Sequence, residues 1–303
     1  MPRYDLCLAW NWEYDAGFAR LLDEACTRRG LTLFQATPAN LDLLPAALES
    51  GDLLFRAFFD RASDSDARFQ PLVDWARREN VFQINPQGQC RWAWDKATMH
   101  LEFINRGLHT PYTLILPPQV EQPDLPPLDL SLLGGPFAIK PAGGGGGWGV
   151  VLEATSLEQV QNARQEYPQE KVLLQSHIEP VSLEGRPAWF RVLVCDGAVY
   201  PCWWDARTHV YARVTAEENF RYRLGGLRQV AQRIAQVCRL HLFSTEIALT
   251  GNGDLIVTDY VNDPVDLRLQ SEALDGVPDE IVGNIAARLA RITERSVKIG
   301  ATA

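Results

Sequence analysis

The chain has 303 residues, a formal net charge of −9 and 46% hydrophobic residues, enough apolar material for one large domain or two. The negative charge argues against a general nucleic-acid-binding or anionic-membrane-binding surface. No apolar run is long enough to span a membrane, and the N-terminal stretch lacks the pattern of a secretion signal. We therefore expect a cytoplasmic protein.

Cysteine and histidine give no sign of a zinc site or of disulfides. The cysteines form no C-x-x-C pair, and the histidines show no H-x-x-x-H spacing. Several cysteines lie in apolar runs, so we expect buried free thiols at positions Cys7, Cys26, Cys90, Cys195, Cys202 and Cys238.

Residues 1–94 alternate between strand-like and helix-like segments. Apolar runs predict strands over residues 3–10, 31–37, 52–59 and 81–85, and 3.6-residue periodicity predicts helices over 15–30 and 67–80. This alternation predicts a small α/β domain with a parallel sheet. Arg56 and Arg61 lie near the end of a predicted strand, where such sheets bind ligands, and arginine suits carboxylate recognition. The alternative is a solvated, turn-forming stretch.

The pattern changes after residue 94. A helix is predicted over 95–107, and a proline-rich linker or surface excursion over 116–136. Short strands then follow, and residues 243–261 are typical of a hairpin with its turn at or near Asn252-Gly253. Further helices are predicted over 156–167, 227–240 and 278–294.

Five consecutive glycines follow the strand-like "FAIK", which ends in Lys140. The spacing fits a dinucleotide fingerprint, but that motif needs a helix next and "GVVLEA" is strand-like. A protein-kinase loop places its lysine after the glycines and needs H-R-D and D-F-G, and a P-loop ends in Gly-Lys-Ser/Thr. This chain matches neither motif. What remains is a hairpin whose N–H groups approach a phosphate, or else a flexible surface hairpin. The glycines are Gly143, Gly144, Gly145, Gly146 and Gly147.

Three segments together resemble the ATP-grasp superfamily, closest in layout to glutathione synthetase and ribosomal-protein glutamate ligases. "DKATMHLEFINRGLHTPYT" resembles its first lysine and helix, "KVLLQSHIEP" its adenine hinge, and "STEIALTGNGDLIVTDYVND" its two acidic strands. The resemblance covers residues 95 to about 295. It implies an α/β (α+β ATP-grasp) fold, in which a parallel α/β domain over 1–94 precedes two lobes, over 95–178 and 179–303, that clamp the nucleotide.

The resemblance assigns nucleotide-binding roles. The chain has only four lysines, and Lys96 and Lys140 fall on the two positions expected to bind phosphates. The glycine run would lie on the phosphates as a mobile lid. The adenine edge would be bound after Gln175, by the backbone of Ser176, His177 and Ile178, and Glu184 would reach the ribose.

The resemblance also implies a magnesium site. Glu246 and Asp259 lie on facing strands of the predicted hairpin, and magnesium prefers oxygen ligands. The family usually shows Glu-x-Asn, whereas this chain has Asp259-Tyr-Val-Asn262, with one extra residue. Asn262 therefore needs a bulge or the strand end to join the carboxylates, and Asp263 is its rival.

The implied activity is an ATP-dependent ligase that joins a carboxylate to an amine or thiol through an acylphosphate. Arg191 would stabilise the transferring phosphoryl group, and Arg268 would face the acceptor. The cofactors would be ATP and Mg²⁺, with Mn²⁺ as a substitute. We expect small-molecule carboxylate and nucleophile substrates and no nucleic-acid or membrane partner, and a homodimer is compatible with the sequence. A polyol phosphate kinase and a non-catalytic ATP-binding module are the alternatives.

Overall fold

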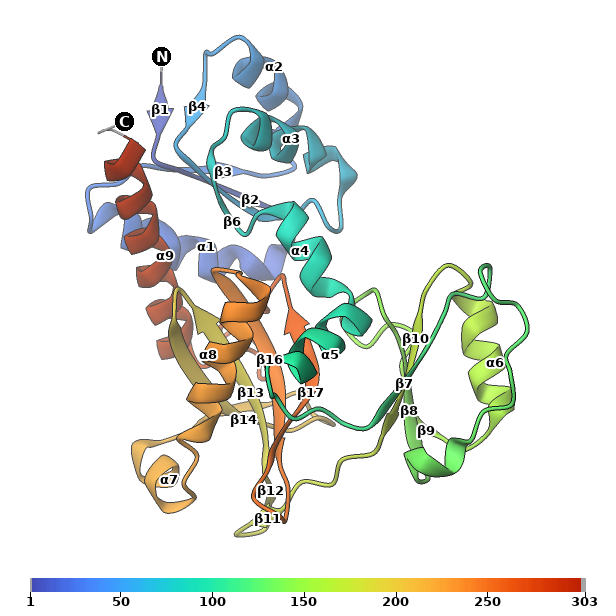
Figure 1. Ribbon diagram of the computed structural model, residues 1–303. Helices are drawn as coiled ribbons and strands as arrows, with labels where there is room; N and C mark the ends of the chain where they lie inside the picture. The colour runs from blue at the N-terminus through green and yellow to red at the C-terminus, as the bar shows by residue number, and fades with distance from the viewer. Residues whose placement is uncertain (1, 301–303) are drawn as a thin grey trace.

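The computed structural model describes residues 2–300 and contains three main sheets (Figure 1). The first is parallel, in the order β3-β2-β5-β6, and confirms the predicted N-terminal α/β arrangement. Leu6 and Leu8 of β2 pack on the α1 side, and Cys7 and Ala9 pack on the α2–α3 side. Both faces are therefore covered, as expected for a parallel sheet. The strands and helices are β1 (Arg3–Tyr4), β2 (Leu6–Trp10), α1 (Ala16–Thr27), β3 (Leu33–Ala36), α2 (Leu44–Glu49), β4 (Leu54–Phe55), β5 (Ala57–Arg61), α3 (Gln70–Arg78) and β6 (Phe82–Ile84).

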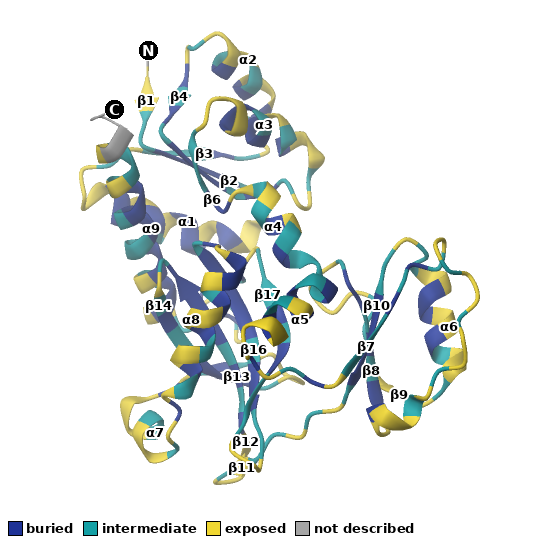
Figure 2. Cartoon of the chain, viewed as in Figure 1, coloured by how far each residue is buried: buried dark blue, intermediate teal, exposed yellow. Residues whose placement is uncertain are grey.

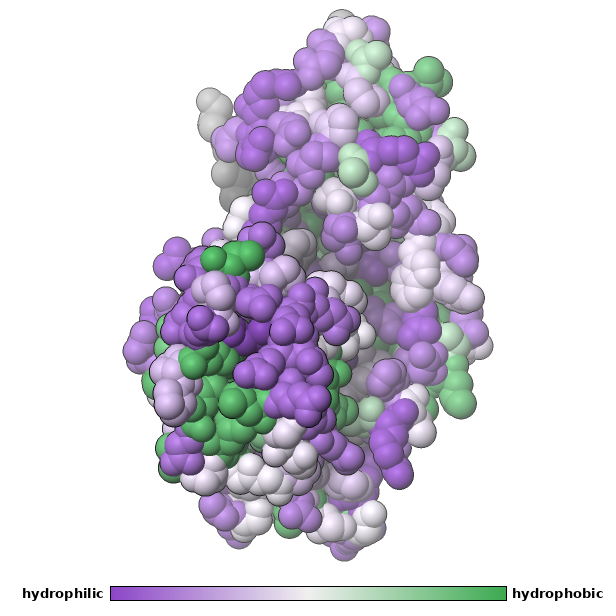
Figure 3. All heavy atoms as spheres, turned by 90° about the vertical axis from the view of Figure 1, so that its right-hand side faces the viewer, coloured by the Kyte–Doolittle hydropathy of each residue, from purple (hydrophilic) through white to green (hydrophobic). Residues whose placement is uncertain are grey.

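The second sheet is antiparallel, in the order β7-β10-β8-β9. One face packs on α6, while β9 is a largely exposed edge strand. Figure 3 turns this part of the molecule toward the viewer and shows a hydrophobic area among polar side chains. Helices α4 (Gln87–Trp94) and α5 (Lys96–Asn105) lead into β7 (Thr113–Leu116), β8 (Phe137–Pro141), β9 (Val151–Ala154), α6 (Leu157–Glu166) and β10 (Val172–Ser176).

The third sheet has the order β15-β14-β13-β16-β17 and is also antiparallel. Helices α5 and α8 cover one face, and α9 lies against the other beside α1 (Figure 1). The elements are β11 (Ser182–Leu183), β12 (Arg186–Pro187), β13 (Trp189–Cys195), β14 (Ala198–Trp204), β15 (Tyr211–Arg213), α7 (Ala216–Arg221), α8 (Gly226–Cys238), β16 (Leu242–Leu249), β17 (Leu255–Asn262) and α9 (Asp279–Gly300). Short 3-10 turns lie at Glu13–Asp15, Leu41–Leu43, Ala67–Phe69 and Leu130–Leu133.

Buried residues from different predicted domains pack in the same hydrophobic clusters. Figure 2 shows where the buried residues lie. Met99 and Phe103 of α5 pack with Phe190 of β13, and Leu289 of α9 shares a cluster with Phe18 of α1. The division of the chain at residues 94 and 178 stays a prediction. The six cysteines are buried and free, as predicted. Among residues 2–300, no helix is both long and apolar enough to cross a bilayer.

The structure corrects the expected role of the two arginines near β5. Arg61 is 6% exposed, and its guanidinium donates to Asp15 at 2.7 and 2.9 Å and to the Val265 carbonyl at 2.9 Å. Its donors are thus used inside the protein. Arg56 precedes β5 and so lies at the amino end of that strand, away from the carboxyl edge. Neither arginine presents a free guanidinium at the ligand-binding edge of the sheet.

The Asp15–Arg61 pair predicts a stability effect. Asp15→Ala leaves a buried guanidinium uncompensated and should lower the free energy of unfolding by about 3–5 kcal/mol. Glu24→Ala, which removes the exposed partner of Arg20 on α1, should cost about 1 kcal/mol or less. Urea unfolding followed by tryptophan fluorescence compares the two. Equal effects of both substitutions would show that the buried pair does not stabilise this domain.

Candidate functional site

Two carboxylates face each other on the last two strands of the third sheet, β16 and the edge strand β17. Glu246 of β16 is the register partner of Asp259 of β17. The next pair toward the end of β17 is Ser244 with Asn262, so an extra residue separates Asp259 from Asn262. This register shift brings Asn262, the last residue of β17, to the side of Asp259, which it hydrogen-bonds; the sequence required a bulge or the strand end for this placement.

Asp263, the rival of Asn262, points elsewhere. Its carboxylate accepts a hydrogen bond from Asn85 Nδ2 at 2.9 Å, and it also contacts the Cys90 thiol. Burial raises the pKa of Asp263 to about 6. The structure thus places Asp263 against the N-terminal domain, and Asn262 is the residue that lies with the two carboxylates.

Arg191 and Trp189 hold Glu246 from the adjacent strand β13. Arg191 Nη1 donates to Glu246 Oε1 at 3.0 Å, and Trp189 Nε1 donates to Oε2 at 3.2 Å. Arg191 Nε also donates to Ser244 Oγ at 3.3 Å, and its guanidinium lies 5.0 Å from the centroid of the Trp204 ring. Burial raises the pKa of Glu246, and the charge of Asp259 adds to this effect, while Arg191 opposes it.

The two predicted lysines converge on Asp259. Burial disfavours the charged form of Asp259, yet Lys140, Lys96 and Arg191 outweigh this effect and hold its pKa below the ordinary value. Lys140 Nζ donates to the Thr258 carbonyl at 2.9 Å, and Lys96 Nζ donates to the Gly144 carbonyl at 2.6 Å. Burial lowers the pKa of Lys96, against the attraction of Asp259.

Both lysines are positioned by ordinary local structure. Lys96 is the first residue of α5, directly after the N-cap Asp95, whose side chain accepts from the Thr98 N–H at 2.8 Å. Lys140 is the penultimate residue of β8. Segments far apart in the sequence therefore bring two ammonium groups to one carboxylate pair.

The glycine run forms the exposed turn of the β8–β9 hairpin, as predicted. Gly144, Gly146 and Gly147 have positive φ angles, which favour glycine. Glu170 Oε2 accepts a hydrogen bond from the Gly143 N–H at 2.9 Å. An anionic oxygen thus already binds one N–H of this loop.

The predicted adenine hinge follows a buried strand end. Gln175 is 1% exposed, its Nε2 donates to Tyr260 Oη at 2.6 Å, and its Oε1 has no protein partner among the described residues. The Ser176 N–H donates to the Tyr112 carbonyl at 2.9 Å, so it is used inside the protein. His177 is exposed and Ile178 is partly exposed, so their backbone groups remain the candidates for a base edge.

Two other predicted residues have local partners. Glu184 lies in the exposed β11–β12 turn and forms an ion pair with Arg221. The guanidinium of Arg268 is bound by Asp266 and Asp275 at 2.7 and 2.9 Å and lies against the Trp12 ring. Trp203 and Trp204 are buried in the core.

No protein-family model and no curated protein matches the sequence. Solved structures do match. A RimK domain ATP-grasp protein from Sphaerobacter thermophilus is 22% identical, with 93% of this chain and 97% of that chain covered, at a TM-score of 0.62. A D-alanine–D-alanine ligase from Bacillus anthracis complexed with ATP is 12% identical, with 99% and 98% covered, at 0.64. A D-cycloserine synthetase is 17% identical, with 96% and 99% covered, at 0.61.

The chain has the ATP-grasp fold. The likeness spans nearly the whole chain in each comparison, so the N-terminal domain and both sheets that follow it are part of the match. At these identities the likeness establishes the fold, and the chemistry must be argued from the residues of this chain.

The oxygen donors of this ATP-grasp chain fit a hard cation. The described residues contain no cluster of three or more His, Cys, Asp or Glu side chains that could bind a metal by itself. Glu246, Asp259 and Asn262 instead offer two carboxylates and an amide. Magnesium commonly takes one or two carboxylates and completes its shell with phosphate oxygens and water, so this set suits it.

Sequence reasoning missed the groups that support the glycine hairpin of the ATP-grasp chain. Besides Glu170, the ring of Trp148 meets that of Tyr167 edge-on, with centroids 4.1 Å apart. A Cβ on Gly149 would lie 2.6 Å from the Tyr167 ring and 2.8 Å from Pro141. Trp148 lies in the glycine loop and Tyr167 directly follows α6. Their contact could be predicted only if the packing of α6 beside the loop were already known.

The hairpin geometry predicts different outcomes at two glycines. Gly149→Ala puts a Cβ on a left-handed residue against the Tyr167 ring and should lower the free energy of unfolding by about 1–3 kcal/mol. Gly145→Val enters open space at an ordinary φ and should leave stability nearly unchanged. Thermal unfolding followed by circular dichroism compares the variants. Loss of stability at Gly145 but not at Gly149 would contradict this geometry.

Proposed function

We propose that this chain is an ATP-dependent ligase that joins a small-molecule carboxylate to an amine, or to a thiol, with release of ADP and phosphate. The observation that carries the proposal is the convergence of Lys96, Lys140 and Arg191 on Glu246 and Asp259, with Asn262 beside them. Cations and acidic oxygens gathered in this way suit a triphosphate with its metal ion.

The residues support a division of labour at the nucleotide. Lys96 and Lys140 would neutralise phosphate oxygens, since each now donates to a main-chain carbonyl that a phosphate can replace. The N–H groups of the glycine hairpin would lie along the phosphates and exclude water on closure. The unpaired Gln175 Oε1 supports base recognition at the hinge, because it can accept a hydrogen bond from an exocyclic amine.

The protein's part in the reaction would be positioning and charge stabilisation. A carboxylate oxygen of the substrate would attack the γ-phosphorus of ATP, and the bond to ADP would break. An amine nitrogen would then attack the acyl carbon of the acylphosphate, phosphate would leave, and the amine proton would depart with it. Magnesium held by Glu246, Asp259 and Asn262 would supply charge neutralisation of the phosphates. Arg191 would stabilise charge on the transferring group.

A cavity of about 540 Å³ supports an acceptor site between the N-terminal domain and the loop after β17. Trp12, Ser65 and Val265 contribute to its wall together with the Asp15–Arg61 pair. Asp64 lines it too, and burial and the charge of Asp60 raise the pKa of this carboxyl. Because the cation of Arg61 is neutralised by Asp15, the cavity favours an amine-bearing acceptor over a phosphorylated one.

The same cavity bears on the two alternatives. A polyol phosphate kinase needs a basic acceptor pocket, and the described lining contains one arginine, which is already paired. In this chain Glu246 faces Asp259 and is bound by Arg191. A module that only binds ATP does not need this arrangement. Both features favour the ligase.

The test incubates the purified protein with Mg-ATP and a mixed metabolite extract and follows products by mass spectrometry. We expect a new mass equal to two metabolites minus water, together with ADP and phosphate, and loss of that product in Glu246→Gln, since that variant loses the carboxylate charge. A matched Glu24→Gln variant, which removes an exposed carboxylate on α1 far along the chain from the site, should retain the product.

Two results would overturn the ligase proposal. A metabolite that gains a phosphoryl group would identify a kinase. Measurable ATP binding with no ATP-dependent product in any extract, and no effect of Glu246→Gln on binding, would identify a binding module.

A further inference from the structure

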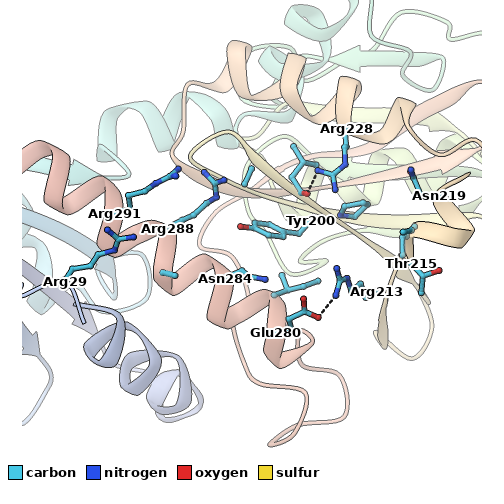
Figure 4. Close-up of a pocket in the computed structure, with 17 residues that line it drawn as sticks. Arg29, Tyr200, Arg213, Thr215, Asn219, Arg228, Glu280, Asn284, Arg288 and Arg291 are labelled. Atoms are coloured by element: carbon cyan, nitrogen blue, oxygen red, sulfur yellow. Dashed lines mark hydrogen bonds and ion pairs between the residues drawn. The ribbon is translucent and has the colours of Figure 1, made fainter. Parts of the chain in front are cut away.

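A second cavity, of about 590 Å³, lies at the edge of the third sheet where β15 stops covering β14 (Figure 4). Its walls come from β14, the segment from β15 into α7, the start of α8, and α9, with Arg29 from the turn after α1. None of its lining residues belongs to the candidate nucleotide and metal site. The cavity is therefore a separate feature of the fold.

The lining is strongly basic in a protein whose net charge is −9. Arg29, Arg213, Arg228, Arg288 and Arg291 line the cavity, and Glu280 is the single carboxylate among its described lining residues. Figure 4 shows Arg29, Arg288 and Arg291 at one end, with Arg213 and Arg228 toward the other. Positive side chains thus approach the cavity from both ends.

The arginines outnumber the acids that pair with them. Asp196 pairs with Arg288, Arg291 and Arg295, at 3.9, 3.2 and 2.8 Å. One carboxylate thus serves three guanidinium groups. Arg291 Nε is buried with no protein partner among the described residues.

Of the other three lining arginines, Arg29 pairs with Glu294 at 2.7 Å, whereas Arg213 and Arg228 are incompletely neutralised. Arg228 Nη1 donates to the Val199 carbonyl at 2.9 Å, and no carboxylate within ion-pair distance is found for it among the described residues. Arg213 pairs with Glu280, which is itself exposed. A positive surplus therefore remains at this cavity.

The strand edge inside the cavity is already closed to a further strand. The Val199 carbonyl accepts from Arg228, and the Pro201 carbonyl accepts from the Val214 N–H at 3.2 Å. Pro201 has no N–H to offer, which is a common way of protecting an edge. These backbone groups are therefore not available to pair with an extended peptide, and the cavity suits a small molecule.

We propose that this cavity binds a small organic anion that carries two or more carboxylate or phosphate groups. Arginine forks bind both groups in a bidentate manner. The lining also includes the apolar residues Val199, Pro201, Ile281 and Ala287. Figure 4 shows the hydrogen-bonding side chains of Tyr200 and Asn284 between the two basic ends. This composition fits a carbon skeleton with an anionic group at each end.

The test is calorimetric titration of the full chain with citrate and, separately, with pyrophosphate at physiological ionic strength. We expect saturable binding of at least one probe, and the tighter probe identifies carboxylate or phosphate as the preferred group. Arg288→Gln should weaken that binding at least fivefold. Glu280→Gln removes the carboxylate that competes for Arg213 at an exposed position and should tighten it at least threefold.

Two controls separate this site from the nucleotide site and from general charge. Lys140→Met should leave the affinity for the probe unchanged, because Lys140 does not line the cavity. Arg77→Gln removes an exposed arginine on α3 and should also have no effect. The proposal is overturned if neither probe binds saturably, if Glu280→Gln and Arg288→Gln leave the affinity unchanged, or if Lys140→Met abolishes binding.

Discussion

The candidate site depends on two carboxylates that the sheet forces together. Glu246 and Asp259 are register partners on β16 and β17 and are poorly hydrated. Two negative charges in that position repel each other, and burial penalises both. The surrounding cations offset this repulsion and the cost of burial. Arg191 binds Glu246, while Lys140 and Lys96 lower the pKa of Asp259.

The second and third sheets and helix α5 contribute different charged residues to the site. The third sheet supplies the carboxylates and Arg191 from three neighbouring strands. The second sheet supplies Lys140 at a strand end and the glycine hairpin that follows it. Helix α5 contributes Lys96 from its first turn while its buried face packs on the third sheet. The candidate nucleotide site therefore lies between the second sheet and the third sheet with helix α5, and the relative position of these parts sets the distances between the charges.

Local signals predicted much of this from the sequence. The N-cap Asp95 with Lys96, the strand that ends in Lys140, and the hairpin around Asn252-Gly253 are all short-range patterns, and the structure has them. The offset at Asp259-Tyr-Val-Asn262 could be recognised as requiring a bulge, because alternation alone would put Asn262 on the wrong face.

What could not be predicted depends on long-range pairing. Asp15 neutralises Arg61 across 46 residues of sequence, so the strand-end pattern alone suggested a free guanidinium. Glu170 binds the Gly143 N–H across 27 residues. Helix α4 was not predicted either, and its buried Cys90 and Ala93 pack in the same core cluster as α8, so tertiary packing stabilises it.

The central claim is that Lys140 and the glycine hairpin bind the phosphates of ATP. The direct measurement is calorimetric titration of Mg²⁺ and a non-hydrolysable ATP analogue into the wild type, Lys140→Met, Gly145→Val and the matched variant Lys171→Met, whose lysine pairs with Asp95. We predict at least tenfold weaker binding, about 1.4 kcal/mol, for Lys140→Met and for Gly145→Val, and little change for Lys171→Met. Equal affinities in all four proteins would contradict the account.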